Sequence, residues 1–239
     1  MKQLLSVILL SSMIGFTNTT FASSYEEATK ATTVGEITFT ENGDPEIPVD
    51  PENPNIPVVP VEPVNPENAE LMISYVSDFR FGEQDKSLNS WQALADTVYV
   101  NKEKKQMKEI VPFITTKDIR GSSRKGWILT VTQNDDFRDE NGEILKGAEL
   151  QLSGLHYPSL DGAPAINADT ITIGKEAQAI VKANETTGVG QWSLALGELK
   201  GEEQKKTTGI TLNVPETTAK KNTTYSTSLT WELIADPFF

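Results

Sequence analysis

Three of the four tryptophans in this 239-residue chain stand two positions before a leucine. The pairs are Trp127/Leu129, Trp192/Leu194 and Trp231/Leu233. Residues i and i+2 of a β-strand point to the same face of a sheet, so each pair would present one wide apolar surface. Two interpretations stay open: the pairs line a buried core, or their indole faces stack on the sugar rings of a glycan.

The residue types that usually carry out catalysis are scarce. The chain has no cysteine and one histidine, His156. These counts exclude disulfides, thiol catalysis and cysteine-based or multi-histidine metal sites. Neither a Gly-x-Ser-x-Gly motif nor a glycine-rich phosphate loop is present. We expect no catalytic residues, no metal and no cofactor, although the many carboxylates leave a pair of the glycosidase type open as an alternative.

Two charged segments could bind ions or polymers. In an EF-hand register with Gly142 at the sixth position, the acidic stretch 134–143 would place Phe137 first and Ala148 last, and neither can ligate calcium. We interpret it as an acidic hairpin with a type I′ turn at Asn141-Gly142, with a looser calcium site as the alternative. The second segment is basic and contains Lys102, Lys104, Lys105 and Lys108. We interpret it as a solvated loop, with a contact for an anionic wall polymer as the alternative.

The net charge of −13 is unevenly distributed along the chain. Acidity argues against nucleic acid as a partner, because phosphate binding needs a basic face. The stretch from Ala31 to Phe79 has ten acidic residues and no Lys or Arg, whereas the chain from Arg80 onward is nearly balanced. Most of the negative charge therefore belongs to one short segment.

That acidic segment also holds eight prolines, which recur at every third residue from Pro45 to Pro66. Polyproline II has three residues per turn, so this spacing would align the prolines along one edge. Repulsion between the carboxylates favours an extended chain. We expect residues 23–68 to be a disordered, acidic, proline-repeat spacer, with docking into a proline-binding groove as the alternative.

Residues 1–22 are typical of a signal peptide. Lys2 is followed by a mostly apolar stretch over residues 4–16, and Thr20-Phe21-Ala22 forms a cleavage site. The apolar stretch is short for a membrane span, and no later segment is long and apolar enough to cross one. We expect a secreted, extracellular protein that does not span a membrane.

Residues 69–239 show the period-two alternation of half-buried antiparallel strands. Two stretches, 91–100 and 102–110, are weakly helical instead. We predict an all-β fold, an antiparallel β-sandwich or barrel-like domain. The alternating segments lie at 71–76, 127–132, 149–153, 170–173, 192–196, 210–214 and 224–233.

In their order along the chain, several short motifs resemble those of WxL-domain surface proteins of low-GC Gram-positive bacteria, of the small, single-domain type. The two defining motifs would be Trp127/Leu129 and Trp231/Leu233, and Trp192/Leu194 lies where the family pattern is looser. Besides these, the resemblance rests on Ser74-Tyr75-Val76-Ser77 with Phe81-Gly82, Val111-Pro112-Phe113, Asp118-Ile119-Arg120-Gly121, Gly126-Trp127 to Gln133, Leu145-Lys146-Gly147-Ala148 and the terminal Asp236-Pro237.

The resemblance implies a wall-binding domain over 69–239 that attaches non-covalently to the Gram-positive cell wall by binding peptidoglycan. It further implies partners among surface proteins encoded with such proteins, including WxL-interacting membrane proteins, and in some members host matrix proteins. The sequence agrees on one point, since it has no Leu-Pro-x-Thr-Gly sorting motif. Two alternatives stay open: an interaction module or adhesin whose main ligand is a protein, with indirect wall retention, and a wall-active hydrolase.

Overall fold

The computed structural model describes residues 24–27, 30–32, 47–100, 103–121, 124–202 and 204–237. These residues form strands, turns and loops, and none of the described residues is helical. Every strand pair is antiparallel. The predicted all-β, antiparallel fold class is therefore confirmed. The chain divides into two compact units, Met1–Asn42 and Gly43–Phe239.

The first unit contains one described element, a small antiparallel hairpin. Strand β1 (Ser24–Glu27) pairs with β2 (Lys30–Thr32), with a register shift between Tyr25 and Glu27. This hairpin falls within the predicted spacer. The predicted signal peptide, residues 1–22, lies outside the described residues and stays a prediction.

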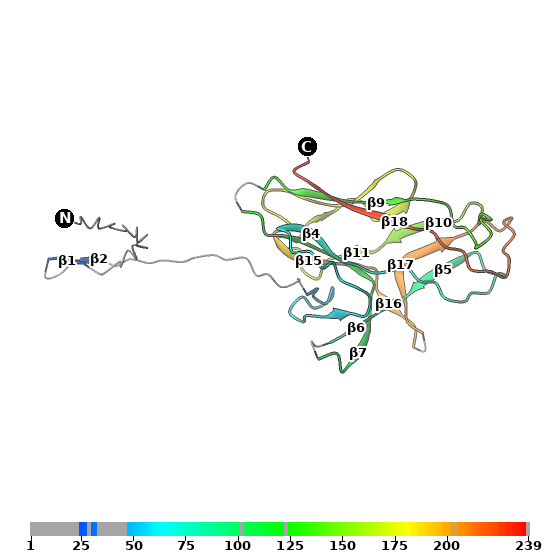
Figure 1. The fold of residues 1–239 in the computed structure, drawn as a ribbon, viewed down its shortest axis with the longest axis horizontal. Helices are drawn as coiled ribbons and strands as arrows, with labels where there is room; N and C mark the ends of the chain where they lie inside the picture. Colours follow the sequence, from blue (N-terminus) through cyan, green and yellow to red (C-terminus); the bar gives the residue numbers. More distant parts are fainter. Residues whose placement is uncertain are drawn as a thin grey trace, which may run out of the picture. The chain divides into compact units, whose positions relative to one another are not determined.

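The second unit is built from four antiparallel sheets (Figure 1). The first holds β13 (Thr170–Ile173), β10 (Glu149–Ser153), β17 (Lys206–Asn213) and β16 (Leu199–Lys200), with β5 (Ser90–Leu94) also on β17. The second holds β11 (Leu155–His156), β15 (Gly190–Leu196), β8 (Phe113–Asp118) and β4 (Leu71–Val76). The third holds β12 (Ala165–Ile166), β14 (Gln178–Ala183), β9 (Trp127–Gln133) and β18 (Leu229–Ala235), and the fourth holds β3 (Val59–Pro60), β6 (Asp96–Tyr99) and β7 (Met107–Ile110).

The main core is formed by the inward-facing residues of the first three sheets. Leu150 and Leu152 of β10 pack there with Ile171 and Ile173 of β13, as their alternation predicts. Leu194 of β15 lies in the same cluster. The predicted strand at 224–233 begins later than expected, at Leu229.

The two stretches with weak helical character form strands. β5 covers the start of the stretch 91–100, and its Trp91 is opposite Leu212 of β17. β6 and β7 form a hairpin in which Val98 is opposite Lys108. Helix propensity is a weak preference in short segments, and pairing with neighbouring strands outweighs it.

Residues 47–67 form a segment that packs on the domain, which we call the proline strap. Val58 is fully buried, and its N–H donates a hydrogen bond to the Pro48 carbonyl oxygen at 2.9 Å. Val59 and Pro60 form β3, which pairs with β6. For these residues the structure differs from the sequence prediction of a disordered spacer, and the packed region begins well before the predicted boundary at residue 69.

The proline strap covers a second, smaller core. Val58 packs there with Tyr75, Val98, Ile110 and Phe113. Tyr75 and Phe113 project from β4 and β8 on the face opposite the main core, and their ring centroids are 4.8 Å apart. The strap and the β6–β7 hairpin therefore bury the second face of this sheet, which explains why every residue of β8 is buried.

Candidate functional site

The two defining motifs lie on neighbouring strands, β9 and β18. Leu129 is directly opposite Leu233, Trp231 is opposite Val131, and Trp127 is opposite Ala235. Residues directly opposite one another in an antiparallel pair share a face of the sheet. The tertiary structure thus brings the four predicted site residues, Trp127, Leu129, Trp231 and Leu233, onto one face. That face belongs to the main core.

Trp127 and Leu129 are core residues, with exposed fractions of 0% and 1%. Trp127 lies between two small residues, Ala183 of β14 and Ala235 of β18. Gly188, at φ +66°, packs against the indole, and a Cβ there would come within 2.9 Å of a ring carbon. Burial on all sides leaves this tryptophan no surface for a ligand.

Trp231 and Leu233 have a different environment, because β18 is the last strand of its sheet. Both side chains are only partly buried. Trp231 packs against Phe79, which follows β4, with ring centroids 6.2 Å apart and planes at 82°. The second tryptophan therefore keeps part of its indole exposed beside another aromatic ring.

Trp231 and Phe79 line an open groove of about 480 Å³ between the segment that follows β4 and the start of β18. We call it the aromatic groove. Its floor and walls combine apolar and polar groups, a composition typical of ligand sites. The lining residues are Val76, Ser77, Asp78, Phe79, Arg80, Phe81, Phe137, Leu150, Thr227, Ser228, Leu229 and Trp231.

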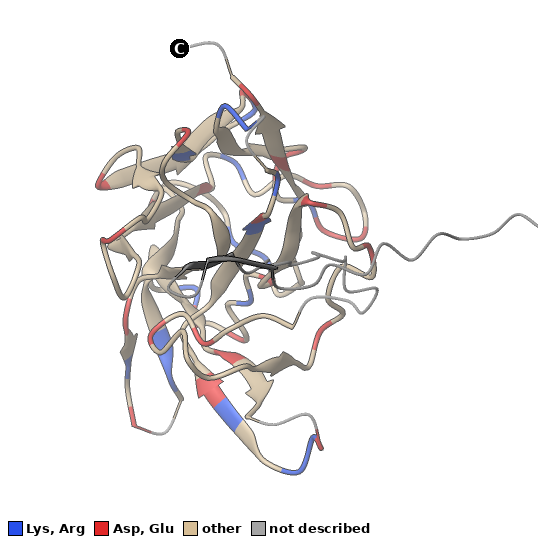
Figure 2. Cartoon of the chain, turned by 90° about the vertical axis from the view of Figure 1, so that its left-hand side faces the viewer, with Lys and Arg blue, Asp and Glu red and all other residues tan. Residues whose placement is uncertain are grey.

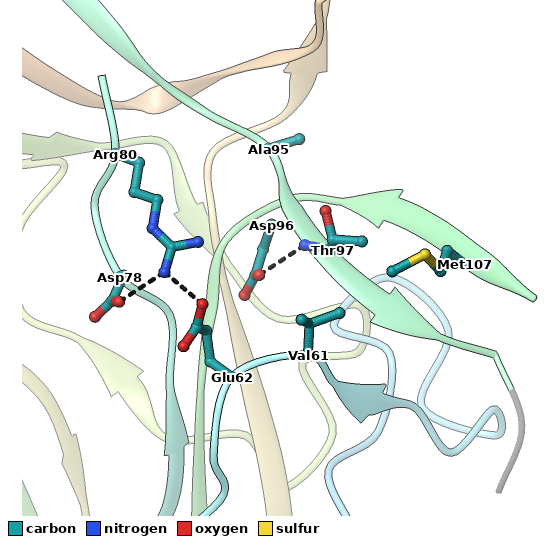
Figure 3. A pocket seen from close by; sticks show the side chains of 8 residues that line it. All are labelled: Val61, Glu62, Asp78, Arg80, Ala95, Asp96, Thr97 and Met107. Atoms are coloured by element: carbon teal, nitrogen blue, oxygen red, sulfur yellow. Dashed lines mark hydrogen bonds and ion pairs between the residues drawn. The ribbon is translucent and has the colours of Figure 1, made fainter. Parts of the chain in front are cut away.

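Arg80 forms the boundary between this groove and a smaller pocket of about 200 Å³ (Figure 3). Its Nη2 group pairs with Glu62 of the proline strap and, at 3.1 Å, with Asp78. Hydrogen bonding to Glu62 is the main reason that the pKa of the guanidinium is raised. The strap thereby fixes the position of a charged residue at the rim of the groove.

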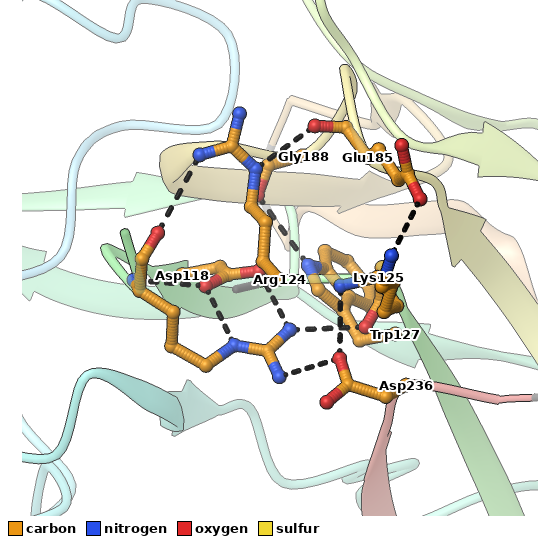
Figure 4. Close-up of polar contacts among 9 residues, drawn as sticks. Asp118, Arg124, Lys125, Trp127, Glu185, Gly188 and Asp236 are labelled. Atoms are coloured by element: carbon orange, nitrogen blue, oxygen red, sulfur yellow. Dashed lines mark hydrogen bonds and ion pairs between the residues drawn. The ribbon is translucent and has the colours of Figure 1, made fainter. Parts of the chain in front are cut away.

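A second cluster of charges joins three of the family-like motifs at the opposite end of β9 (Figure 4). Arg120 donates to both carboxylate oxygens of Asp118 at 3.0 Å, to Asp236 at 2.8 Å and to the Gly126 carbonyl oxygen at 3.0 Å. Asp118 is 1% exposed, so its charge is compensated almost entirely by this arginine. We call this cluster the Arg120 latch, because it holds the end of β18 to the start of β9.

The latch also shifts the pKa values of its members. The pKa of Arg120 is raised, first by its hydrogen bonds to Asp118. The pKa of Asp236 is lowered, first by the backbone N–H of Lys125 and then by Arg120.

Gly126, at φ +101°, sits so close to Ala183 that a Cβ on this glycine would lie 2.1 Å from the carbonyl oxygen of Ala183. This close approach explains the glycine before Trp127.

Trp192 lies apart from the aromatic groove. It packs edge-on against Tyr157, with centroids 5.5 Å apart, and its Nε1 donates to the Val189 carbonyl oxygen at 2.9 Å. Its partly buried indole also contacts the main core. The third Trp-x-Leu pair is thus a separate packing feature.

The basic cluster is tied to neighbouring acids. Lys108 pairs with Asp50 of the proline strap at 2.8 Å, and Lys105 pairs with Glu103 at 2.6 Å. Asp50 is 1% exposed, and its other oxygen caps the backbone N–H groups of Glu52 and Asn53. Lys102 lies outside the described residues.

Basic and acidic residues are interspersed over the second unit (Figure 2).

The acidic segment 134–143 forms the predicted hairpin with a different turn. The N–H of Gly142 donates to the Asp139 carbonyl oxygen, and Gly142 alone is left-handed, at φ +81°. A type I′ turn would need a positive φ at Asn141 too, so this is a type I turn followed by a left-handed glycine. The Asp139 carboxylate caps the N–H groups of Asn141 and Glu143.

The described residues lack two further features. No group of three or more His, Asp or Glu side chains is placed to hold a metal ion among them. Within the same residues, no helix has the length and apolar character needed to cross a membrane.

The sequence analysis did not predict the contribution of residues 77–81 to the groove. Ser77 and the Phe81-Gly82 pair were part of the resemblance but had no predicted role. Phe79 and Phe81 alternate with Asp78 and Arg80 in this segment, and that alternation was the available signal. Trp231, which contacts Phe79, is 152 positions later in the chain, so only the fold places Phe79 and Trp231 together.

Comparison with known proteins identifies the family. The family model described as "WxL domain surface cell wall-binding" matches residues 26–237, which is most of the chain. No curated protein and no solved structure matches.

Proposed function

The chain belongs to the WxL family of surface cell-wall-binding domains, and on that premise we propose that it attaches non-covalently to the Gram-positive wall by binding peptidoglycan. Wall binding at the cell surface is the property of the family. Peptidoglycan as the component bound, and a binding role without catalysis, are our proposals. We also propose that residues 1–22 direct export.

The observation that supports this proposal best is the position of the second motif. Trp231 is partly exposed in the aromatic groove beside Phe79, and the polar side chains of Asp78 and Arg80 line the same groove. Partly exposed aromatic rings with polar groups at the rim suit ligands that carry both apolar faces and hydrogen-bonding groups. Peptidoglycan, with its sugar rings and amides, is such a ligand.

Co-sedimentation with purified, protein-free peptidoglycan sacculi tests the proposal. We expect saturable retention of the purified protein, without release of soluble muropeptides. Absence of retention would contradict the proposal. Released muropeptides would replace it with a hydrolase, because binding alone leaves the polymer intact.

A second candidate function is favoured by the position of β18 at the edge of its sheet. An edge strand can pair with a strand of another protein, which is a common mode of recognition. In this case a surface protein, such as a WxL-interacting membrane protein or a host matrix protein, would be the main ligand. Retention on sacculi only after addition of such a partner would support this candidate over the first.

A further inference from the structure

We propose that the aromatic groove binds the glycan strand of peptidoglycan, and not its stem peptide, with Phe79 and Trp231 as the apolar walls and Arg80 as the polar contact. This inference rests on the proposed function and specifies which part of the polymer is recognised. It assigns a binding role to residues 78–80, which lie outside both Trp-x-Leu motifs.

The first argument is the shape and lining of the groove. Its volume of about 480 Å³ falls within the range of sites for small ligands, roughly 300–1,000 Å³. Phe79, in the segment after β4, and Trp231, on β18, stand edge to face, so the groove has aromatic surface in two orientations. A pyranose ring has a flat apolar face of C–H groups and a polar edge, and it can use both kinds of surface.

The second argument concerns hydrogen-bonding groups that are still available. Both described ion pairs of Arg80 use Nη2. Among the described residues this leaves Nε and Nη1 as donors, on a side chain that is 58% exposed. Carbonyl oxygens of N-acetyl groups, which recur along a peptidoglycan glycan strand, are suitable acceptors. The Thr227 hydroxyl already donates to the Asp135 carbonyl oxygen. The Ser228 hydroxyl accepts from the Asn134 amide, so its O–H can act as a second donor beside the guanidinium of Arg80.

The third argument is the charge of the groove. Asp78 and Arg80 are the charged residues of its lining, and they pair with each other. The lining is therefore neutral overall, which matches the uncharged sugar backbone. A stem peptide carries ammonium groups as well as carboxylates, and an ammonium group would find Asp78, the one acidic residue of the lining, already paired with Arg80.

The experiment compares three probes: intact sacculi, glycan strands stripped of stem peptides by an amidase, and a synthetic stem peptide. Because the amidase leaves a lactyl carboxylate on each muramic acid, these carboxylates are converted to methylamides so that the stripped strand stays uncharged. Calorimetry and co-sedimentation give the affinities. We expect the wild-type protein to bind sacculi and stripped glycan with similar affinity and to leave the stem peptide unbound. Binding of the stem peptide with loss of binding to stripped glycan would overturn the inference, while retention on sacculi would leave the proposed function standing.

Variants test the named residues. Phe79→Leu keeps an apolar side chain but removes the aromatic face, and Arg80→Gln removes the charged donor. We expect each to weaken binding of stripped glycan at least tenfold, with an unchanged melting temperature for Arg80→Gln. Trp192→Phe is the matched control, because Trp192 lies outside the groove, and we expect wild-type binding. Unchanged binding in the folded Arg80→Gln and Phe79→Leu variants would place the glycan elsewhere and overturn the inference.

Discussion

Trp127 and Trp231 stand in the same three-residue motif and on the same face of one sheet, yet their surroundings differ. Trp127 starts the interior strand β9, with neighbours on both sides, and is fully buried. Trp231 lies on the edge strand β18, with a neighbouring strand on one side, and lines a groove. A Trp-x-Leu motif therefore places its tryptophan and leucine on the same face of a sheet. The position of the strand within the sheet decides how much of the tryptophan a ligand can reach.

The largest effect is expected from Trp127→Ala. This change leaves a large cavity between Ala183 and Ala235, so we expect the free energy of unfolding to fall by about 3–5 kcal/mol. Chemical denaturation followed by circular dichroism measures the loss. A cost no greater than that of the matching change at Trp231 would remove the distinction between the two motifs.

The next effect concerns the Arg120 latch, which connects the ends of the two motif strands. Arg120→Ala leaves the buried Asp118 carboxylate without its partner, and we expect a loss of about 3 kcal/mol in unfolding free energy. Arg138→Ala is the control, because it breaks an exposed, solvent-screened ion pair with Asp135 and should cost much less than Arg120→Ala. Equal costs for the two variants would mean that the latch is no more than a surface ion pair.

Trp231→Ala should separate stability from binding. Because the side chain is only partly buried, we expect a smaller loss of unfolding free energy, about 1–2 kcal/mol. Under conditions where the variant is folded, co-sedimentation with sacculi should drop sharply. A folded variant that is retained like the wild type would show that Trp231 serves packing alone.

The smallest effect is on the pH dependence of stability. The Lys125 N–H and Arg120 lower the pKa of Asp236 in the folded state, so its contribution is complete above the ordinary pKa of about 4 and is lost as the pH falls through the lowered value. Asp236→Asn should therefore flatten the fall in melting temperature as the pH is lowered below about 4. Parallel curves for the two proteins would show that Asp236 does not contribute to the linkage.

Local patterns predicted the strands and their buried faces well. Leu150 and Leu152 alternate with polar residues along their strand, and Ile171 and Ile173 do the same along theirs. All four are buried in the core, as this alternation predicts. Trp91 was harder to assign, because its short segment has weak helical character and becomes a strand by pairing with Leu212, 121 positions away. The aromatic groove was not predictable for a similar reason, since Phe79 and Trp231 meet only in the folded chain.

The proline strap shows the limit of composition. Its three-residue repeat and acidic residues indicated an extended, solvated segment, but Val58 is fully buried and Asp50 is neutralised by Lys108. Prolines lack an N–H donor, so such a segment can pack against a sheet with few backbone hydrogen bonds to satisfy.

The sequence by itself determined the all-β class, the WxL family and the fact that the two residues of each motif share one face of a strand, because period-two alternation is a local property of a strand. The tertiary structure alone decided which tryptophan is buried, that Asp118, Arg120 and Asp236 form one latch, and that residues 47–67 cover the second face of a sheet. These outcomes depend on pairing between distant segments. Strand order and burial follow from the packing of the whole domain, which no local pattern contains.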